Sequence, residues 1–396
     1  MSVMWVALVL ALSFSVASTA HARPVELTVV SYNVWGVPMV SPDRGARIAE
    51  IARRLAGVDA DLIALQELWV PEDADRIGAA LADAGLPHQQ RFGTSPDKQS
   101  ESGLFIASRY PIEDARFEAF RVGTTPYIPW HLDWMARKGV ALVRVATPAG
   151  PLHFANTHLQ ATYAMGDYTF VQVSQALQVA KMVRATDDSA PPLLVVGDLN
   201  ALPDDLPVRV LATRAGLRHA SPSYEIDQVL SRSGTSVRAE VVDSKTAFTD
   251  PVVFQTGQNR TLSDHPMVVT RYRLDDCEGC GAPLEQGHWG SVAAEVVTHL
   301  RAELQGTERF MVFGRVATVA LIALLGWLLF RRRRHATRFA IGRSVALTAT
   351  LLTFATWAGY IGWHYAPGRL HEIDEQRAAF ELGLSVSSDA DGTARR

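Results

Sequence analysis

Polar residues that can bind a metal ion or transfer a proton stand at or near the ends of the predicted strands. Residues at one rim of a sheet can converge on one pocket even when they lie far apart in the chain. Each of them alone is equally typical of a turn, a solvated loop acid or a structural histidine, so only the combination predicts a site. The combination consists of Asn33, Glu67, His158, Asp198, Asn200, Asp227, Asp264 and His265.

Local spacing adds two geometric expectations. Asp198 and Asn200 stand at i and i+2, which places both side chains on one side of an extended chain. Asp264 and His265 are adjacent, and adjacent side chains on an extended chain face opposite ways. These two residues can therefore share a site only where the backbone bends.

The donor set is rich in oxygen, since it combines acids and amides with two histidines. Oxygen ligands suit a hard divalent cation such as Mg²⁺ better than a zinc site. Such a cation neutralises phosphate charge, while one histidine activates water and the other protonates the leaving oxygen. The set predicts a phosphodiesterase or a phosphatase, and the chain has neither a Gly-x-Ser-x-Gly nucleophile motif nor a P-loop.

The elements that must position these residues alternate between strands and helices. β-Branched or apolar runs predict strands at 26–34, 61–65, 103–108, 140–146, 152–157, 193–196, 226–230 and 266–272. Helical periodicity predicts helices at 43–56, 72–84 and 168–184. This order predicts one α/β or α+β domain over residues 23–274.

Composition narrows the class of protein. The 396 residues carry 38 basic and 41 acidic side chains, a balance that argues against a generally basic nucleic-acid binder. Two cysteines exclude a disulfide-built scaffold. They form one Cys-x-x-Cys pair, Cys277 and Cys280, which is expected to be either a small disulfide or two free thiols.

Three apolar blocks predict export and membrane attachment. Residues 1–22 end in Ala-His-Ala and read as a signal peptide, with an uncleaved anchor as the alternative. Residues 311–330 and 344–365 each reach the roughly 20 residues needed to cross about 30 Å of hydrocarbon. The arginine-rich loop 331–343 between them is expected on the cytoplasmic side. A buried helical hairpin is the competing interpretation.

This topology puts the large domain outside the cytoplasm, in the periplasm or at the cell surface. Residues 275–310 are then an extracytoplasmic linker, and residues 366–396 are a polar tail on the same side. Arg315 lies near the start of the first predicted span, where its side chain can reach the outer interface. The chain is therefore expected to be a multi-pass membrane protein.

Seven segments resemble the endonuclease/exonuclease/phosphatase superfamily, which has the DNase I-like fold. Trp35, Trp69 and the His-Leu-Gln at 158–160 are similar to the neutral sphingomyelinase branch of that superfamily. The resemblance implies a four-layer α/β/β/α sandwich. The segments are SYNVWG at 31–36, QELW at 66–69, SGLFIASRYP at 102–111, DWMARKG at 133–139, NTHLQ at 156–160, GDLN at 197–200 and SDH at 263–265.

The resemblance also implies roles for the metal ligands. Mg²⁺ is expected to be held chiefly by Glu67, with Asn33 and Asp264 nearby. Mn²⁺ and Ca²⁺ remain open as the working ion. Asp133 and Lys138 are similar to a regulatory Asp–Lys pair of a membrane-bound relative, and a plain surface ion pair is the competing interpretation.

The remaining roles belong to the reaction. Asp198 and Asn200 are expected to position water and phosphate, and His158 to assist at the phosphate or the leaving group. His265 is expected to be the general base, oriented by Asp227. Asp227 is followed by Gln228, where many relatives have an aromatic residue, so the acid matches while its neighbour differs.

The substrate that the resemblance implies is a membrane sphingophospholipid, hydrolysed to ceramide and a phosphorylated headgroup. A tether at the bilayer raises the effective concentration of a lipid substrate. Aromatic residues in 117–134 belong either to an interfacial loop or to the core. The alternatives are another phospholipid or inositol-phosphate phosphoesterase, an exported nuclease, and a non-catalytic lipid-binding module. The oligomeric state stays open.

Overall fold

The computed structural model describes residues 24–93, 95, 101–123, 131–164, 168–184, 191–220, 225–254, 257–281, 286–334 and 341–374. The predicted signal peptide, most of the predicted arginine-rich loop and the tail from residue 375 lie outside the described residues. So do Tyr127 and Trp130 of the predicted aromatic segment.

Sheet one carries the first half of the site. Its order is β11 (Val237–Ala247), β14 (Met267–Asp276), β1 (Val25–Asn33), β2 (Leu62–Gln66), β4 (Phe105–Ser108) and β3 (His88–Arg91). Helices α1 (Arg44–Leu55) and α2 (Pro71–Asp83) pack on its outer face because their apolar positions recur at helical spacing. Ile48, Ile51 and Leu55 form the buried stripe of α1.

Sheet two carries the second half. Its order is β5 (Ile112–Ala119), β6 (Gly139–Thr147), β7 (Gly150–His158), β8 (Leu193–Asp198), β10 (Asp227–Arg232) and β9 (Arg218–His219). Helices α3 (Thr169–Arg184) and α4 (Leu206–Ala215) cover its outer face. A small hairpin of β12 (Val252–Val253) and β13 (Asn259–Arg260) stands apart from both sheets.

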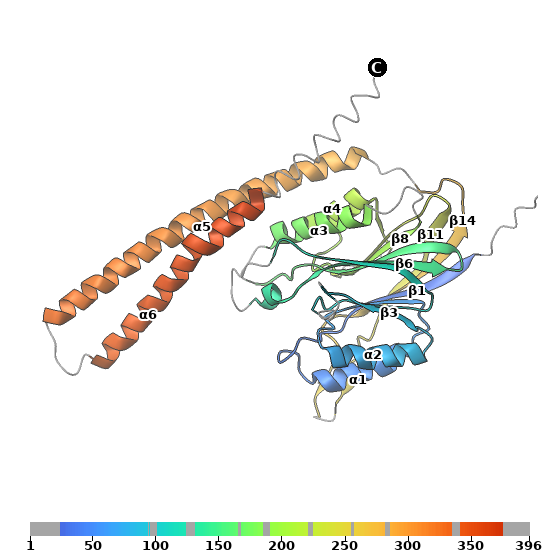
Figure 1. The fold of residues 1–396 in the computed structure, drawn as a ribbon, viewed down its shortest axis with the longest axis horizontal. Helices are drawn as coiled ribbons and strands as arrows, with labels where there is room; N and C mark the ends of the chain where they lie inside the picture. Colours follow the sequence, from blue (N-terminus) through green and yellow to red (C-terminus); the bar gives the residue numbers. More distant parts are fainter. Residues whose placement is uncertain are drawn as a thin grey trace, which may run out of the picture.

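The inner faces of the two sheets share one core, in which Leu27, Ile106 and Phe154 are fully buried or nearly so. The layers therefore run helix, sheet, sheet, helix (Figure 1). This arrangement confirms the expected α/β sandwich. Cys277 and Cys280 form a disulfide just after β14, so the disulfide interpretation holds in the structure.

The C-terminal part is a pair of long helices. Helix α5 (Gln286–Arg334) extends far beyond the sandwich, and α6 (Ile341–Tyr360) with the π-helical turn η4 (Ile361–Tyr365) returns beside it (Figure 1). Among the described residues, one helix, Trp289–Arg331, is long and apolar enough to cross a membrane, with a mean hydropathy of 2.1 in its most apolar window. The second expected span lies in α6 and η4, for which the same test gives no candidate in the described part of the chain.

One expectation for this region needs correction. Residues 286–310, expected as part of a linker, are the first half of α5, because Val292, Val296 and Leu300 pack on the helices of sheet two. Nε of Arg315 donates to the carbonyl oxygen of Gly362 at 2.9 Å, and the place of Arg315 at the outer interface stays a prediction. The two helices meet closely there, since a Cβ on Gly314 would lie 2.8 Å from the backbone nitrogen of Gly362.

Candidate active site

The predicted site residues converge at one edge of the sandwich. β1 and β2 are parallel neighbours, so Asn33 pairs with Gln66 and Glu67 follows directly. β7 and β8 are also parallel, which sets His158 beside Asp198. β10 pairs antiparallel with β8 and brings Asp227 opposite Asp198. The strand ends of both sheets thus meet as the sequence predicted.

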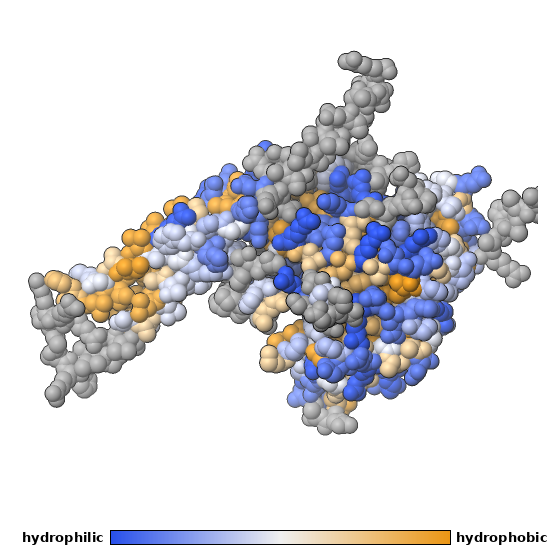
Figure 2. Space-filling model, viewed as in Figure 1, coloured by the Kyte–Doolittle hydropathy of each residue, from blue (hydrophilic) through white to orange (hydrophobic). Residues whose placement is uncertain are grey.

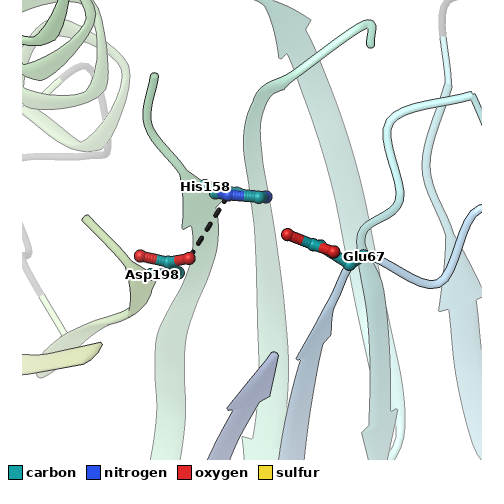
Figure 3. A group of neighbouring side chains, drawn as sticks. All are labelled: Glu67, His158 and Asp198. Atoms are coloured by element: carbon teal, nitrogen blue, oxygen red, sulfur yellow. Dashed lines mark ion pairs between the residues drawn. The ribbon is translucent and has the colours of Figure 1, made fainter. Parts of the chain in front are cut away.

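Two overlapping groups of side chains have metal-ligand spacing. The ligand atoms of Glu67, His158 and Asp198 all lie within 4.8 Å of one another, and Figure 3 shows these side chains turned toward one another from three strand ends. Asp198, Asp227 and His265 form the second group at the same spacing. Asp198 belongs to both groups and is therefore the centre of the site.

Asn33 links the two sheets through its amide. Its Nδ2 donates to Oε1 of Glu67 at 3.1 Å and to Oδ2 of Asp198 at 3.0 Å. Its Oδ1 accepts the backbone N–H of Trp35 at 3.0 Å, which fixes the amide orientation. Asn33 is fully buried, so this arrangement holds two carboxylates that would otherwise repel each other.

The two histidines stand on either side of Asp198. Nε2 of His158 lies 3.3 Å from Oδ2 of Asp198, and Nε2 of His265 lies 3.6 Å from the same oxygen. Nδ1 of His265 is 2.8 Å from Oδ2 of Asp227, so that carboxylate orients the ring. The predicted relation between Asp227 and His265 is present in the geometry.

A bend before β14 separates Asp264 from His265, as their adjacency required. Ser263 holds the bend, because its hydroxyl donates to the Asn33 carbonyl at 2.7 Å and accepts the His265 N–H at 3.2 Å. His265 turns into the site, whereas Asp264 is exposed and belongs to neither metal-spaced group of the described residues. The charge of Asp264 nevertheless helps to raise the pKa of Glu67, so Asp264 lies near the site, and its role at the metal stays a prediction.

Asn200 stabilises the loop after β8 through two hydrogen bonds. Its backbone N–H donates to Oδ1 of Asp198 at 2.9 Å, and its side chain donates to the carbonyl of Leu159 at 3.1 Å. Asn200 has a φ of 48° and Glu67 a φ of 59°, a left-handed conformation that costs a non-glycine residue about 1–3 kcal/mol. The strained backbone of both residues occurs where their side chains enter the site.

Burial and charge shift the titration of the site residues. Burial raises the pKa of the Glu67 carboxyl to about 7. Burial and the neighbouring Asp227 charge raise the pKa of Asp198 to about 6. Burial and the charge of Lys138 hold the pKa of His158 well below its usual value, so this imidazole is neutral.

His265 shifts in the opposite direction. Burial lowers the pKa of its imidazole, but the hydrogen bond to Asp227 and the charge of Asp198 outweigh burial and raise that pKa to about 10. The two histidines of the site are therefore chemically distinct. One is held neutral, and the other is strongly basic in a field of carboxylates.

The residues fit a divalent cation. Oε2 of Glu67 is buried and has no hydrogen-bond partner among the described residues. Glu67, Asp198 and Asp227 crowd negative charge into a small volume, which is costly without a cation. Carboxylate oxygens are hard donors, so the set suits Mg²⁺, Mn²⁺ or Ca²⁺ better than a soft metal.

The Asp133–Lys138 pair is buried, so its interpretation as a surface ion pair is wrong. Nζ of Lys138 lies 2.9 Å from Oδ2 of Asp133, and the two side chains are 6% and 13% exposed. Lys138 also donates to the carbonyl of Leu159 at 3.0 Å, and Asp133 accepts the N–H of Ala161. The pair therefore holds the loop that follows His158.

Sequence reasoning missed a buried arginine that clamps two site loops. Arg47 of α1 is fully buried and donates to the carbonyls of Val34, Trp35 and Leu262 at 3.2, 2.7 and 2.6 Å. The first two follow Asn33, and the third precedes the bend at Ser263. The apolar pattern of α1 did not predict this role, because a charged residue such as Arg47 is normally expected on the exposed face of a helix.

A polar contact between the sheets was also missed. Nε2 of Gln66 donates to Oδ1 of Asn156 at 2.8 Å, and Nδ2 of Asn156 donates to the carbonyls of Leu65 and Phe105 at 2.9 and 3.1 Å. Both amides are fully buried. They fix sheet one against sheet two beneath the site. Because both residues belong to segments that resemble the superfamily, at 66–69 and 156–160, the sequence did contain a sign that they matter.

Comparison with known proteins places the chain among phosphoesterase relatives. It is 31% identical to "Putative neutral sphingomyelinase" of Drosophila melanogaster over 276 residues, which are 63% of this chain and 61% of that protein. It is 30% identical to "Inositol phosphosphingolipids phospholipase C" of Schizosaccharomyces pombe over 207 residues, which are 52% and 48%. The chain thus spans about half to three fifths of these relatives.

The fold is similar to that of sphingomyelinase C from Streptomyces griseocarneus. The TM-score is 0.50 at 22% sequence identity, and the match covers 62% of this chain and 99% of that one. The "Endonuclease/Exonuclease/phosphatase family" model matches residues 30–265, from β1 to His265. The chain therefore belongs to the endonuclease/exonuclease/phosphatase family.

Proposed function

We propose that the chain is a membrane-attached, divalent-metal-dependent phosphodiesterase of the neutral sphingomyelinase type. The observation that carries the proposal is the arrangement around Asp198. A neutral histidine and an Asp227-oriented histidine stand on either side of this carboxylate, next to the unpartnered oxygen of Glu67. Hydrolysis of a phosphodiester needs these components: charge neutralisation, a base for water and a donor to the phosphate.

Each side chain has a role that follows from its surroundings. Asp227 holds His265 through Nδ1, so Nε2 faces the site. The surrounding carboxylates raise the pKa of this imidazole to about 10, and a bound divalent cation would offset their charge and lower that pKa, so that the neutral ring can take the proton of the attacking water. His158 stays neutral and donates a hydrogen bond to a phosphate oxygen, which its low pKa favours over proton transfer to the leaving group. Asp198 and Asn200 orient the water and the phosphate.

Glu67, assisted by Asn33, would hold a Mg²⁺ ion, which when bound supplies positive charge that polarises the phosphate and offsets the carboxylates. In the overall reaction, the water oxygen bonds to phosphorus while the bond from phosphorus to the lipid oxygen breaks. The water's first proton passes to Nε2 of His265. The lipid oxygen takes a proton from solvent as it leaves as a neutral alcohol, and His265 then releases its proton to solvent. Mn²⁺ and Ca²⁺ are the other ions that the same oxygen donors accept.

The substrate proposed is a sphingophospholipid, which is cut to ceramide and a phosphorylated headgroup. Support comes from the two relatives, because the names of both refer to a sphingolipid substrate and the two substrates differ in the headgroup. The inositol phosphosphingolipid of the yeast relative is the specific alternative to sphingomyelin. A nuclease is disfavoured because the near-neutral composition lacks the excess of basic residues that nucleic-acid binding requires.

Membrane attachment belongs to the same proposal. We infer a signal peptide at 1–22, a catalytic domain at 23–274 outside the cytoplasm, and spans at 311–330 and 344–365 joined by the cytoplasmic loop 331–343. The one apolar helix candidate and the exposed apolar residues of α5 support the first span (Figure 2).

The test uses the full chain in detergent with Mg²⁺ and a panel of sphingomyelin, inositol phosphoceramide, phosphatidylcholine and double-stranded DNA, with products followed by mass spectrometry. We expect ceramide release that EDTA abolishes and that His265→Ala lowers about a hundredfold or more. His219→Ala, which removes an exposed histidine on β9, is the matched control and retains activity. Ceramide release that survives both EDTA and His265→Ala would contradict the assignment, and cleavage of DNA alone would move the chain to the nucleases.

A further inference from the structure

Exposed apolar side chains gather on three loops around the candidate site. They are Met39, Val40, Trp134, Met135 and Leu202, and we name them the apolar rim. Of the seven exposed large apolar side chains in the described part of residues 24–281, these are five. Exposed apolar groups concentrated at one place mark a contact surface rather than ordinary surface composition.

Each member of the apolar rim is close in sequence to a residue of the site. Met39 and Val40 are in the loop that follows Asn33 and β1. Trp134 and Met135 belong to the 3-10 helix η2 (Leu132–Met135), directly after the buried Asp133. Leu202 stands two residues after Asn200. The loops that build the site therefore also carry the apolar side chains.

The first half of helix α5 packs on the catalytic domain and so fixes the orientation of the domain relative to the apolar second half of the helix. Val292, Val296 and Leu300 of α5 are buried in the core formed by α3, α4 and sheet two. Nη2 of Arg209 on α4 lies 2.6 Å from Oε1 of Glu295. The interface is apolar at its centre and charged at its margin, so the first half of α5 is a docked arm and not a free tether.

The apolar half of α5 begins close to the domain. Leu304 still packs against the core, and the apolar block starts at Met311, so about 10 Å of helix separates them at 1.5 Å per residue. β1 runs toward the side of the domain to which α5 and α6 extend, so the site edge faces that side (Figure 1).

We propose that the apolar rim is a lipid-contact surface, and that the docked arm holds it against the outer surface of the bilayer. This inference rests on the proposed function, since it requires the apolar half of α5 to lie in a membrane. A lipid surface fits better than a protein partner, because the helix enters its apolar segment within about 10 Å of the domain. In this position the site opens directly onto lipid headgroups.

The first test does not depend on activity. The two cysteines of the chain form the disulfide, so a single introduced cysteine can carry an environment-sensitive fluorophore. The labelled full chains, Met39→Cys, Met135→Cys and Leu202→Cys, are placed in lipid nanodiscs that contain nitroxide-labelled lipid. We expect blue-shifted emission and quenching at all three positions. Val242→Cys, at an exposed apolar residue in the middle of β11, is the control and remains in water.

Emission at the three rim positions that matches the Val242→Cys control would overturn the lipid-contact proposal. It would leave the proposed hydrolysis untouched, because the labelling reports position alone. A blue shift that appears only when a second protein is added, without quenching by the lipid nitroxide, would assign the rim to a protein partner and overturn the proposal as well.

The second test separates lipid contact from chemistry. Met135→Glu combined with Leu202→Glu is expected to lower turnover of sphingolipid in nanodiscs about tenfold, by loss of apolar burial in the bilayer. Turnover of a soluble phosphodiester, bis(p-nitrophenyl) phosphate, is expected to stay unchanged. Val242→Glu, in the middle of β11, is the matched control. An equal loss on both substrates would show that the substitutions disturb the site and would overturn the assignment of the rim.

Discussion

Asp198 is the residue on which the site depends most. One of its oxygens accepts the Asn200 N–H, and the other accepts the Asn33 amide and faces both histidines. The side chain is 1% exposed, so its charge is felt by every neighbour. The carboxylates and imidazoles of the site therefore titrate as one system, and a change in any one alters the others.

Protons and a metal ion should compete for this system. With pKa values of about 7 for Glu67 and about 6 for Asp198, both carboxyls hold more protons at pH 6 than at pH 8. Because metal binding needs the ionised carboxylates, affinity for Mn²⁺ is expected to rise about tenfold between pH 6 and pH 8. Electron paramagnetic resonance of free Mn²⁺ measures this affinity directly.

Glu67→Gln is the matched control for the pH effect. It removes the group that titrates near neutrality while keeping the shape of the side chain, so binding is expected to be weak at every pH. Equal wild-type affinities at pH 6 and pH 8 would show that Glu67 is already ionised and is not the proton competitor.

The residue types alone predicted most of the site, and geometry decided the rest. Asn33, Glu67, His158, Asp198, Asp227 and His265 meet as expected because parallel neighbours bring strand ends together. The Ser263 bend that turns His265 inward leaves Asp264 exposed, and the residue types alone could not predict that exposure. Burial of the Asp133–Lys138 pair was not readable either, since it depends on the loop from Leu159 to Ala161.

At the scale of elements, α3 connects the outer layer to the site loops. Gln172 and Gln175 of this helix are buried, although the buried face of a helix is normally apolar. Nε2 of Gln172 donates to the carbonyls of Gln160 and Asn200 at 2.9 and 3.0 Å. Oε1 of Gln175 accepts the Gln160 N–H at 2.7 Å. The weak amphipathicity of α3 thus has a cause: its buried polar side chains hold the loops after His158 and Asp198.

Gln172→Leu should therefore act on the loops rather than on the core. It leaves the buried carbonyl of Gln160 without this donor, which costs about 1–3 kcal/mol of stability. The part-buried carbonyl of Asn200 loses its contact with Gln172 and keeps that with Thr162, so the loop that carries Asn200 loosens. We expect kcat to fall while KM changes little. Lys181→Ala, at an exposed position of the same helix, is the control. Steady-state kinetics with thermal unfolding separates the two effects, and an unchanged kcat in a destabilised variant would assign Gln172 a purely structural role.

Buried strands could be predicted from the sequence, whereas exposed edge strands could not. β1, β2, β7 and β8 are buried on both faces and read as apolar runs. β5 is mostly exposed or half-exposed at the edge of sheet two, so its sequence carries no apolar run and it was missed. Other missed elements are the edge strands β3, β9 and β11, the small β12–β13 hairpin and the short helix α4.

At the scale of the whole molecule, the sandwich and the long helices are one connected structure. Trp289 at the start of α5 lies under the Arg214 guanidinium at 4.5 Å, and Arg369 after η4 lies over the Phe170 ring of α3 at 4.2 Å. Nη2 of Arg369 is also 3.3 Å from Oε1 of Glu303. Both ends of the helical pair therefore contact the layer that supports the site loops. Sequence reasoning placed a linker here, because the apolar stripe of α5 is interrupted by polar residues on its outer face.

Breaking this docking should affect lipid turnover without affecting chemistry. Val296 is 1% exposed in the α5 interface, and Val296→Asp would place a charge in that apolar contact, which favours release of the arm from α3 and α4. We expect slower hydrolysis of sphingolipid in nanodiscs, since a freely rotating domain loses its fixed orientation at the surface. Hydrolysis of the soluble phosphodiester should be retained, because α5 provides none of the candidate catalytic residues.

Ala294→Asp provides the matched comparison, since it adds the same charge to an exposed position of α5 two residues away. Hydrogen exchange at the backbone of residues 289–304 measures whether the arm has been released. Release of the arm with full turnover in nanodiscs would mean that tethering alone, through high local concentration, serves the enzyme. Release with selective loss of lipid turnover would mean that the orientation set by α5 determines how the site meets the bilayer.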